Sequence, residues 1–127
     1  MEPPPSEYVT LVEVMELTSS FEEFAAAIKA AATRLEAEGI DELVMLQFYA
    51  TPGSAEVGSI LTFTDRTRMM EHIGMITKWE EFERFFATVR PLDVRVYGKL
   101  NTEAEEWVRQ FGVVSKTFGD HVAGFVR

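Results

Sequence analysis

The chain has 127 residues, a formal net charge of −9 and 46% hydrophobic residues, which suits one folded domain rather than a disordered segment. A negative field repels nucleic-acid phosphates and anionic lipids, so neither nucleic acid nor a membrane is an expected partner. No apolar run approaches the roughly 20 residues that a membrane-spanning helix needs. The chain contains no cysteine, which excludes disulfides and thiolate chemistry and favours the cytoplasm.

Residues 1–7, which include three consecutive prolines, predict a flexible extended tail before a single domain over 8–127. They lack the basic and then apolar pattern of a signal peptide. β-Branched and aromatic residues over 8–17 predict a strand with two largely apolar faces. A helix is predicted over 21–38, because Ser20 and Glu23 form a capping box before it and Gly39 is a stop signal after it.

The middle of the chain predicts a hairpin followed by helices. Strands over 42–49 and 56–63 flank a turn rich in Thr, Pro, Gly and Ser. The next stretch predicts two short helices or one kinked helix, with its cap and break signals at Asp65, at Gly74, and at the capping box of Thr77 and Glu80.

The C-terminal third begins with Pro91, which we expect to end the helical region before a strand over 93–97. Three further elements are predicted: a helix capped at Asn101 and Thr102, an extended segment over 113–118 and a short strand over 121–126.

The element order β-α-β-β-α-β, followed by α-β, predicts an α+β fold of the ferredoxin-like kind with an antiparallel sheet and a C-terminal αβ extension. Two helices cannot cover both faces of such a sheet, and the second face also carries large apolar residues. Monomers rarely leave so large an apolar surface in water. A homodimer with sheet facing sheet, a dimeric α+β barrel, is therefore the expected assembly.

A family likeness supports this fold. The run Phe63-Thr64-Asp65, His72, three phenylalanines over 82–86, and Pro91 before the strand 94–98 resemble the antibiotic biosynthesis monooxygenase (ABM) domains of the dimeric α+β barrel superfamily. The resemblance covers roughly 8–97. It implies a pocket between sheet and helices, and oxygen chemistry on quinol- or anthrone-type substrates that needs no metal or cofactor.

His72 is the candidate catalytic residue, since a histidine can act as general base towards a phenolic substrate. A structural, hydrogen-bonded histidine is the alternative. In the cofactor-free oxygenases that the chain resembles, an Asn precedes a Trp by one helical turn. Trp79 fits the Trp, but Met75 takes the place of the Asn and cannot donate a hydrogen bond. Trp79 could stack on a planar ligand or fill the core beside Phe82.

The remaining candidate ligand-binding residues come from two strands. Arg95 and Tyr97 share one strand face, and Arg95 could pair with Glu13 or bind an oxygen anion of a ligand. A surface or inter-subunit salt bridge is the favoured alternative role for Arg95. Two isolated histidines without cysteine give no zinc-binding pattern, so no metal site is expected.

Two functions are open from the sequence. One is a small homodimer that binds an aromatic or polycyclic ligand in an apolar pocket and acts as a cofactor-independent monooxygenase. The other is a non-catalytic dimerisation or accessory domain in which the same aromatic residues only fill the core. A cavity above about 300 Å³ lined by His72 and Trp79 would favour binding, and a filled interior would favour the accessory domain.

Overall fold

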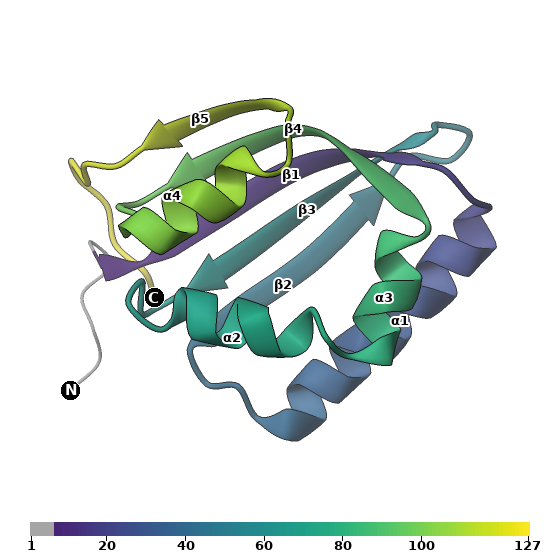
Figure 1. Cartoon of the computed structure of the whole chain (residues 1–127), viewed down its shortest axis with the longest axis horizontal. Coiled ribbons are helices and arrows are strands. Elements are labelled where there is room, and N and C mark those ends of the chain that lie inside the picture. Colours follow the sequence, from purple (N-terminus) through teal and green to yellow (C-terminus); the bar gives the residue numbers. More distant parts are fainter. Residues whose placement is uncertain (1–6) are drawn as a thin grey trace.

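The computed structural model describes residues 7–127, which form one sheet and four helices (Figure 1). The predicted tail therefore lies almost entirely outside the described residues. In chain order the elements are β1 (Val9–Leu17), α1 (Phe21–Glu38), β2 (Leu43–Ala50), β3 (Glu56–Phe63), α2 (Met69–Ile76), α3 (Glu80–Phe86), β4 (Val89–Tyr97), α4 (Thr102–Arg109) and β5 (Val114–Phe118).

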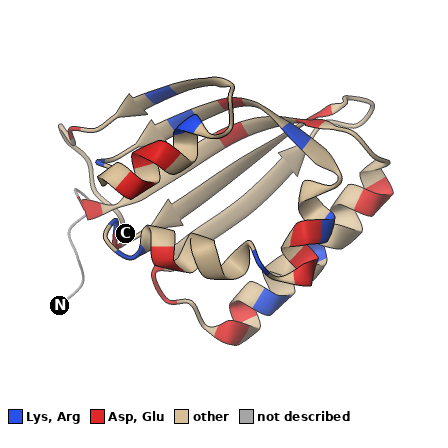
Figure 2. Ribbon diagram, in the orientation of Figure 1, with Lys and Arg blue, Asp and Glu red and all other residues tan. Residues whose placement is uncertain are grey.

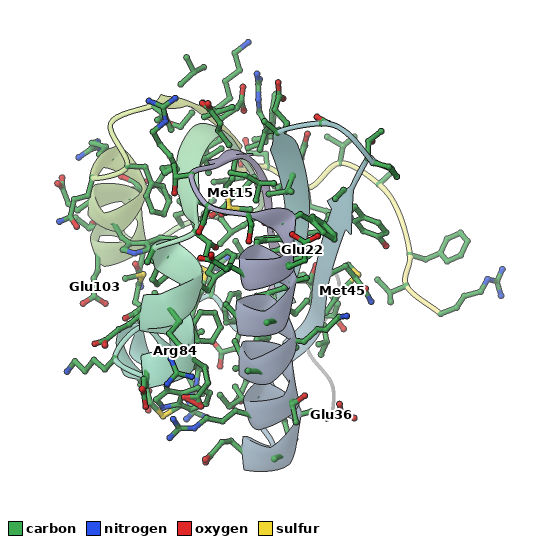
Figure 3. The ribbon with its side chains drawn as sticks, turned by 90° about the vertical axis from the view of Figure 1, so that its right-hand side faces the viewer. Met15, Glu22, Glu36, Met45, Arg84 and Glu103 are labelled. Atoms are coloured by element: carbon green, nitrogen blue, oxygen red, sulfur yellow. The ribbon has the colours of Figure 1, made fainter. Side chains whose placement is uncertain are left out.

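The sheet has the strand order β2-β3-β1-β4-β5. The first four of these strands are antiparallel neighbours, and β5 is parallel to β4 because α4 crosses over between them. This arrangement confirms the predicted ferredoxin-like α+β fold with a C-terminal αβ extension. The helices lie on one side of the sheet, which we call the inner face (Figures 1 and 3).

The core fills the space between the inner face and the helices. On β1 the alternate residues Val9, Leu11 and Met15 are buried and point to this side, as the period of two in a strand requires. The apolar stripe of α1 is buried against β2 and α3. A second buried cluster joins α2 and α4 to the middle strands. No helix of the described chain lies over the other side of the sheet, which we call the outer face (Figure 3).

The ends of α1 agree with the capping signals in the sequence. The Ser20 hydroxyl accepts a hydrogen bond from the Glu23 backbone N–H at 3.1 Å, and Gly39 ends the helix in the left-handed conformation with φ 68°.

Two short helices follow the hairpin, as predicted, but their boundaries differ. Gly74 lies inside α2, and the break comes after it. Thr77 does not form a capping box, because its hydroxyl donates to the Ile73 carbonyl at 2.8 Å. Asp65 accepts hydrogen bonds from the backbone of the next turn, including the Thr67 N–H at 2.9 Å, and does not cap α2 itself.

The prediction that Pro91 ends the helical region is wrong, because Pro91 lies within β4. The β1–β4 register shifts there: Val14 pairs with Asp93 while Met15 pairs with Pro91, so Leu92 is the extra residue of a bulge. A bulge interrupts the ladder hydrogen bonds, which lets a strand tolerate a residue without an N–H.

The predicted terminal strand over 121–126 is also wrong. This segment forms no strand, because it leaves the sheet edge after β5 and passes beside outer-face residues such as Thr10 and Tyr97. Figure 3 shows it extending away from the helices.

Charged residues gather on the helices and turns, whereas β2 and β3 are almost free of them (Figure 2). None of the helices within residues 7–127 is both long enough and apolar enough to cross a bilayer.

Candidate functional site

A cavity of about 440 Å³ lies between the inner face of the sheet and the helices. Strands β1 to β4 form its floor, and α2, α3 and the residues at the end of α4 form its walls. Most of its surface is apolar, and six aromatic side chains line it: Phe48, Phe82, Phe85, Phe86, Trp107 and Phe111. A space of this size and character is typical of a small-molecule site.

Glu13 is the one titratable side chain that lines the cavity within residues 7–127. It lies on β1 between the inward-facing Leu11 and Met15. Within the described part of the chain it makes no side-chain hydrogen bond or ion pair. Burial in these apolar surroundings disfavours the charged carboxylate and raises the pKa of Glu13 from 4.5 to about 7. The cavity therefore contains an acid that gains or loses its proton near neutral pH.

Ser59 lies beside Glu13 on the cavity floor. The two residues are directly paired across the antiparallel β1–β3 ladder and so point to the same face. Ser59 is 2% exposed, and its hydroxyl has no hydrogen-bond partner among the described residues. Buried hydroxyl groups are normally satisfied, which makes an unpaired one aimed into a cavity a candidate ligand contact.

Of the residues predicted on the second helical region, Phe82 lines the cavity, whereas Trp79 and Met75 do not. Trp79 packs beside Phe82, with ring centroids 6.3 Å apart, and carries the Arg34 guanidinium over its face at 4.1 Å. Arg34 also bonds to Glu81 at 3.0 Å. These contacts occupy the Trp79 ring, and the Met75 side chain is 43% exposed.

His72 is buried in α2, but it is not among the residues that line the cavity. Its Nε2 lies 3.2 Å from a carboxylate oxygen of Glu42, outside hydrogen-bonding geometry. The other oxygen of the Glu42 carboxylate accepts a hydrogen bond from Arg68 at 2.5 Å. The cavity exceeds the expected volume, but His72 and Trp79, which were expected to line it, lie outside it.

Arg95 and Tyr97 lie on the outer face and therefore cannot meet Glu13. Across the β1–β4 ladder Glu13 pairs with Val94, and the side chains on either side of Val94 point the other way. Arg95 instead forms two hydrogen bonds with Asp93, at 2.8 and 3.0 Å, which lower the pKa of Asp93. Tyr97 stacks on Phe118 with ring centroids 5.4 Å apart. The Arg95–Glu13 pair is therefore wrong, and the alternative of a surface salt bridge agrees with the pairing of Arg95 and Asp93.

Sequence reasoning did not select Ser59, Trp107 or Phe111. A strand face that is apolar except for one acid, as at Glu13, was a usable signal for a polar group inside a cavity. Ser59 becomes visible only through the strand register. No group of three or more acidic or histidine side chains that could hold a metal ion occurs within residues 7–127.

The fold is similar to that of solved ABM-like proteins. No family model matches the chain, and no curated protein matches its sequence.

The similarity of this fold to known proteins is found among solved structures. MupZ from Pseudomonas fluorescens superposes with a TM-score of 0.63 at 13% identity and covers 95% of each chain. SnoaB, a cofactor-independent oxygenase from Streptomyces nogalater, gives 0.55 at 13% identity, covering 76% of this chain and 96% of SnoaB. A Caulobacter crescentus structure that bears the name antibiotic biosynthesis monooxygenase gives 0.54 at 10% identity, over 71% and 87% of the two chains. At these identities the comparison establishes a shared fold.

Proposed function

We propose that this protein is a homodimer that binds a planar aromatic or polycyclic ligand in the cavity and oxygenates it without a cofactor. The observation that carries the proposal is the aromatic cavity itself. Six aromatic rings around about 440 Å³ can enclose a flat apolar molecule, whereas an accessory domain needs no such space. The fold shared with SnoaB, which is a cofactor-independent oxygenase, supports the choice of reaction.

The proposed reaction uses the electrons of the ligand to reduce molecular oxygen. In an anthrone-type substrate a methylene carbon loses its two hydrogens and gains one oxygen atom as a carbonyl. The second oxygen atom leaves as water with those two hydrogens, so O₂ is the oxidant and no other redox partner is needed. The apolar lining excludes water from the reactive intermediate.

A second copy of the chain is the proposed cover of the outer face. Three large side chains there are exposed to water: Tyr49 is 61%, Tyr97 48% and Phe118 52% exposed. The segment after β5 adds exposed apolar groups, with Val122 at 93% and Phe125 at 74%. A two-fold dimer would bury both sets, with each C-terminal segment lying on the partner sheet.

The test is ligand binding and oxygen uptake with anthrone, compared between the wild type and a variant with a blocked cavity. Leu61 lines the cavity floor, so Leu61→Trp should fill it and abolish both signals. Val44→Trp, at a residue 54% exposed outside the cavity, is the matched control and should behave as the wild type. Absence of binding and of oxygen uptake in the folded wild type would contradict the proposal, as would full activity in Leu61→Trp.

A further inference from the structure

We infer that Glu13 and Ser59 form a proton-accepting pair that binds a ligand hydroxyl group, so the substrates of this site are neutral aromatic compounds with an ionisable hydroxyl or enol. The inference rests on the proposed function and specifies its substrate class. It replaces His72 as the base, because His72 lies outside the cavity.

Geometry provides the first support. Glu13 and Ser59 are opposite residues on neighbouring strands, and such residues have Cβ atoms about 5 Å apart. One ligand oxygen can therefore contact both side chains. Neither side chain has a side-chain hydrogen-bond partner among the described residues, so both are free to bind a ligand. The third polar side chain of the lining, Thr77, already donates its hydroxyl to Ile73.

Charge provides the second support. Within the described chain, the side chains that β2, β3, β4, α2, α3 and the end of α4 turn towards the cavity include no Lys, Arg or His and no second acid. An anionic ligand would therefore find no cation to compensate it, and would meet the Glu13 carboxylate besides. A neutral hydroxyl group, by contrast, suits a carboxylate that accepts a proton and a serine that donates a hydrogen bond.

The proton-transfer step follows from these two groups. The O–H bond of the ligand breaks, its proton passes to the Glu13 carboxylate, and the electron pair stays on the ligand oxygen. The Ser59 hydroxyl then donates a hydrogen bond to that oxyanion. Because burial raises the pKa of Glu13 to about 7, the carboxylate is a stronger base than an exposed glutamate and still ionises near neutral pH.

The test uses three matched probes: para-nitrophenol, its methyl ether para-nitroanisole, and para-nitrobenzoate. Nitrophenol ionises near neutral pH and its anion is yellow, so the change in absorbance when protein is added, relative to the free probe at the same pH, reports proton transfer in the bound state. We expect the wild type to bind nitrophenol about tenfold more tightly than nitroanisole, to bind nitrobenzoate worst, and to raise the absorbance of the yellow anion above that of the free probe. Glu13→Gln should lose both the preference and the rise in absorbance, and Ser59→Ala should lose most of the preference.

Glu56→Gln is the control, since Glu56 is an exposed acid on the same sheet, and it should match the wild type. Equal binding of nitrophenol and nitroanisole by the wild type, or an unchanged preference in Glu13→Gln, would overturn this inference while leaving the cavity as a ligand site. Binding of none of the probes by the folded wild type would overturn the proposed function and this inference with it.

Discussion

Burying a carboxyl group among aromatic side chains makes the stability of a protein depend on pH. Glu13 carries this dependence here, because its pKa is raised from 4.5 to about 7 by desolvation. Well below pH 4.5 the group is protonated in both the folded and the unfolded chain. Between 4.5 and about 7 the unfolded chain ionises first, so the free energy of unfolding falls as the pH rises.

Glu13→Gln should remove this dependence. At about pH 8 the variant should be more stable than the wild type, by up to about 3 kcal/mol, because it no longer buries a charge. At about pH 4 the two proteins should be equally stable. Urea denaturation at both pH values measures the difference.

The control for this prediction is Glu56→Gln, which removes a charge at an exposed residue and should change stability little at either pH. If the difference in the free energy of unfolding between the wild type and Glu13→Gln were the same at both pH values, the Glu13 carboxyl would have to be well solvated.

At the residue scale the sequence could indicate which side chains are apolar and on which strand face they lie, but not what fills the space between them. The strand pattern already placed Glu13 with Val9, Leu11 and Met15. It could not place His72, because a helical residue beside apolar neighbours can face either a cavity or a polar group elsewhere, here the partly exposed Glu42.

Among the elements, α4 also borders the site. It follows the ferredoxin-like unit, yet Trp107 on this helix and Phe111 just after it help to wall the cavity. Its first turn is fixed by the Asn101 side-chain oxygen, which accepts a hydrogen bond from the Ala104 N–H at 2.8 Å.

Asn101→Ala should therefore lower the free energy of unfolding by about 1 kcal/mol, because an orphan N–H of the first turn loses its partner. It should also weaken binding of the aromatic ligand, since α4 carries part of the cavity wall. Chemical denaturation and a ligand titration measure the two effects.

Thr102→Ala is the matched control, because the exposed Thr102 is the next residue and makes no side-chain hydrogen bond in the described structure. A larger loss of stability in Thr102→Ala than in Asn101→Ala would show that Thr102, the other predicted cap residue, fixes this helix instead.

Helices and strands could be predicted from the sequence where a capping or periodic signal was strong, as at Ser20 and Gly39 around α1. The predictions failed where pairing between distant strands decided the structure. Pro91 lies in a strand because a bulge opposite β1 accommodates it, and 121–126 forms no strand because it pairs with no sheet edge. Neither the bulge in β4 nor the lack of a pairing partner for 121–126 can be recognised from the neighbouring sequence.

At the scale of the whole molecule, the outer face carries exposed aromatic side chains beside polar ones such as Arg95, and no helix within residues 7–127 covers it. Ile60 lies in the middle of this face on β3, paired with Val12 on one side and Gln47 on the other. If a second copy covers the face, a charge at this residue would be buried without a partner, which is strongly unfavourable.

We expect Ile60→Glu to convert the proposed dimer into a monomer in sedimentation velocity at micromolar concentration, while the secondary structure stays intact. Ala30→Glu, on the exposed side of α1, adds the same charge elsewhere and should leave the dimer unchanged. A wild type that sediments as a monomer would contradict the predicted assembly and the role of the C-terminal segment in it.

Some residues of α4 and the turn after it are buried in the core, whereas others line the cavity, and this difference has an evolutionary consequence. Ala104 and Val108 anchor the helix in the core, whereas Trp107 and Phe111 border the cavity. Trp107 and Phe111 pack only against the edge of that core, so mutations at these two residues can reshape the cavity while Ala104 and Val108 stay buried. A lineage could thus acquire new ligands by drift at two residues, while selection on folding acts mainly on their neighbours.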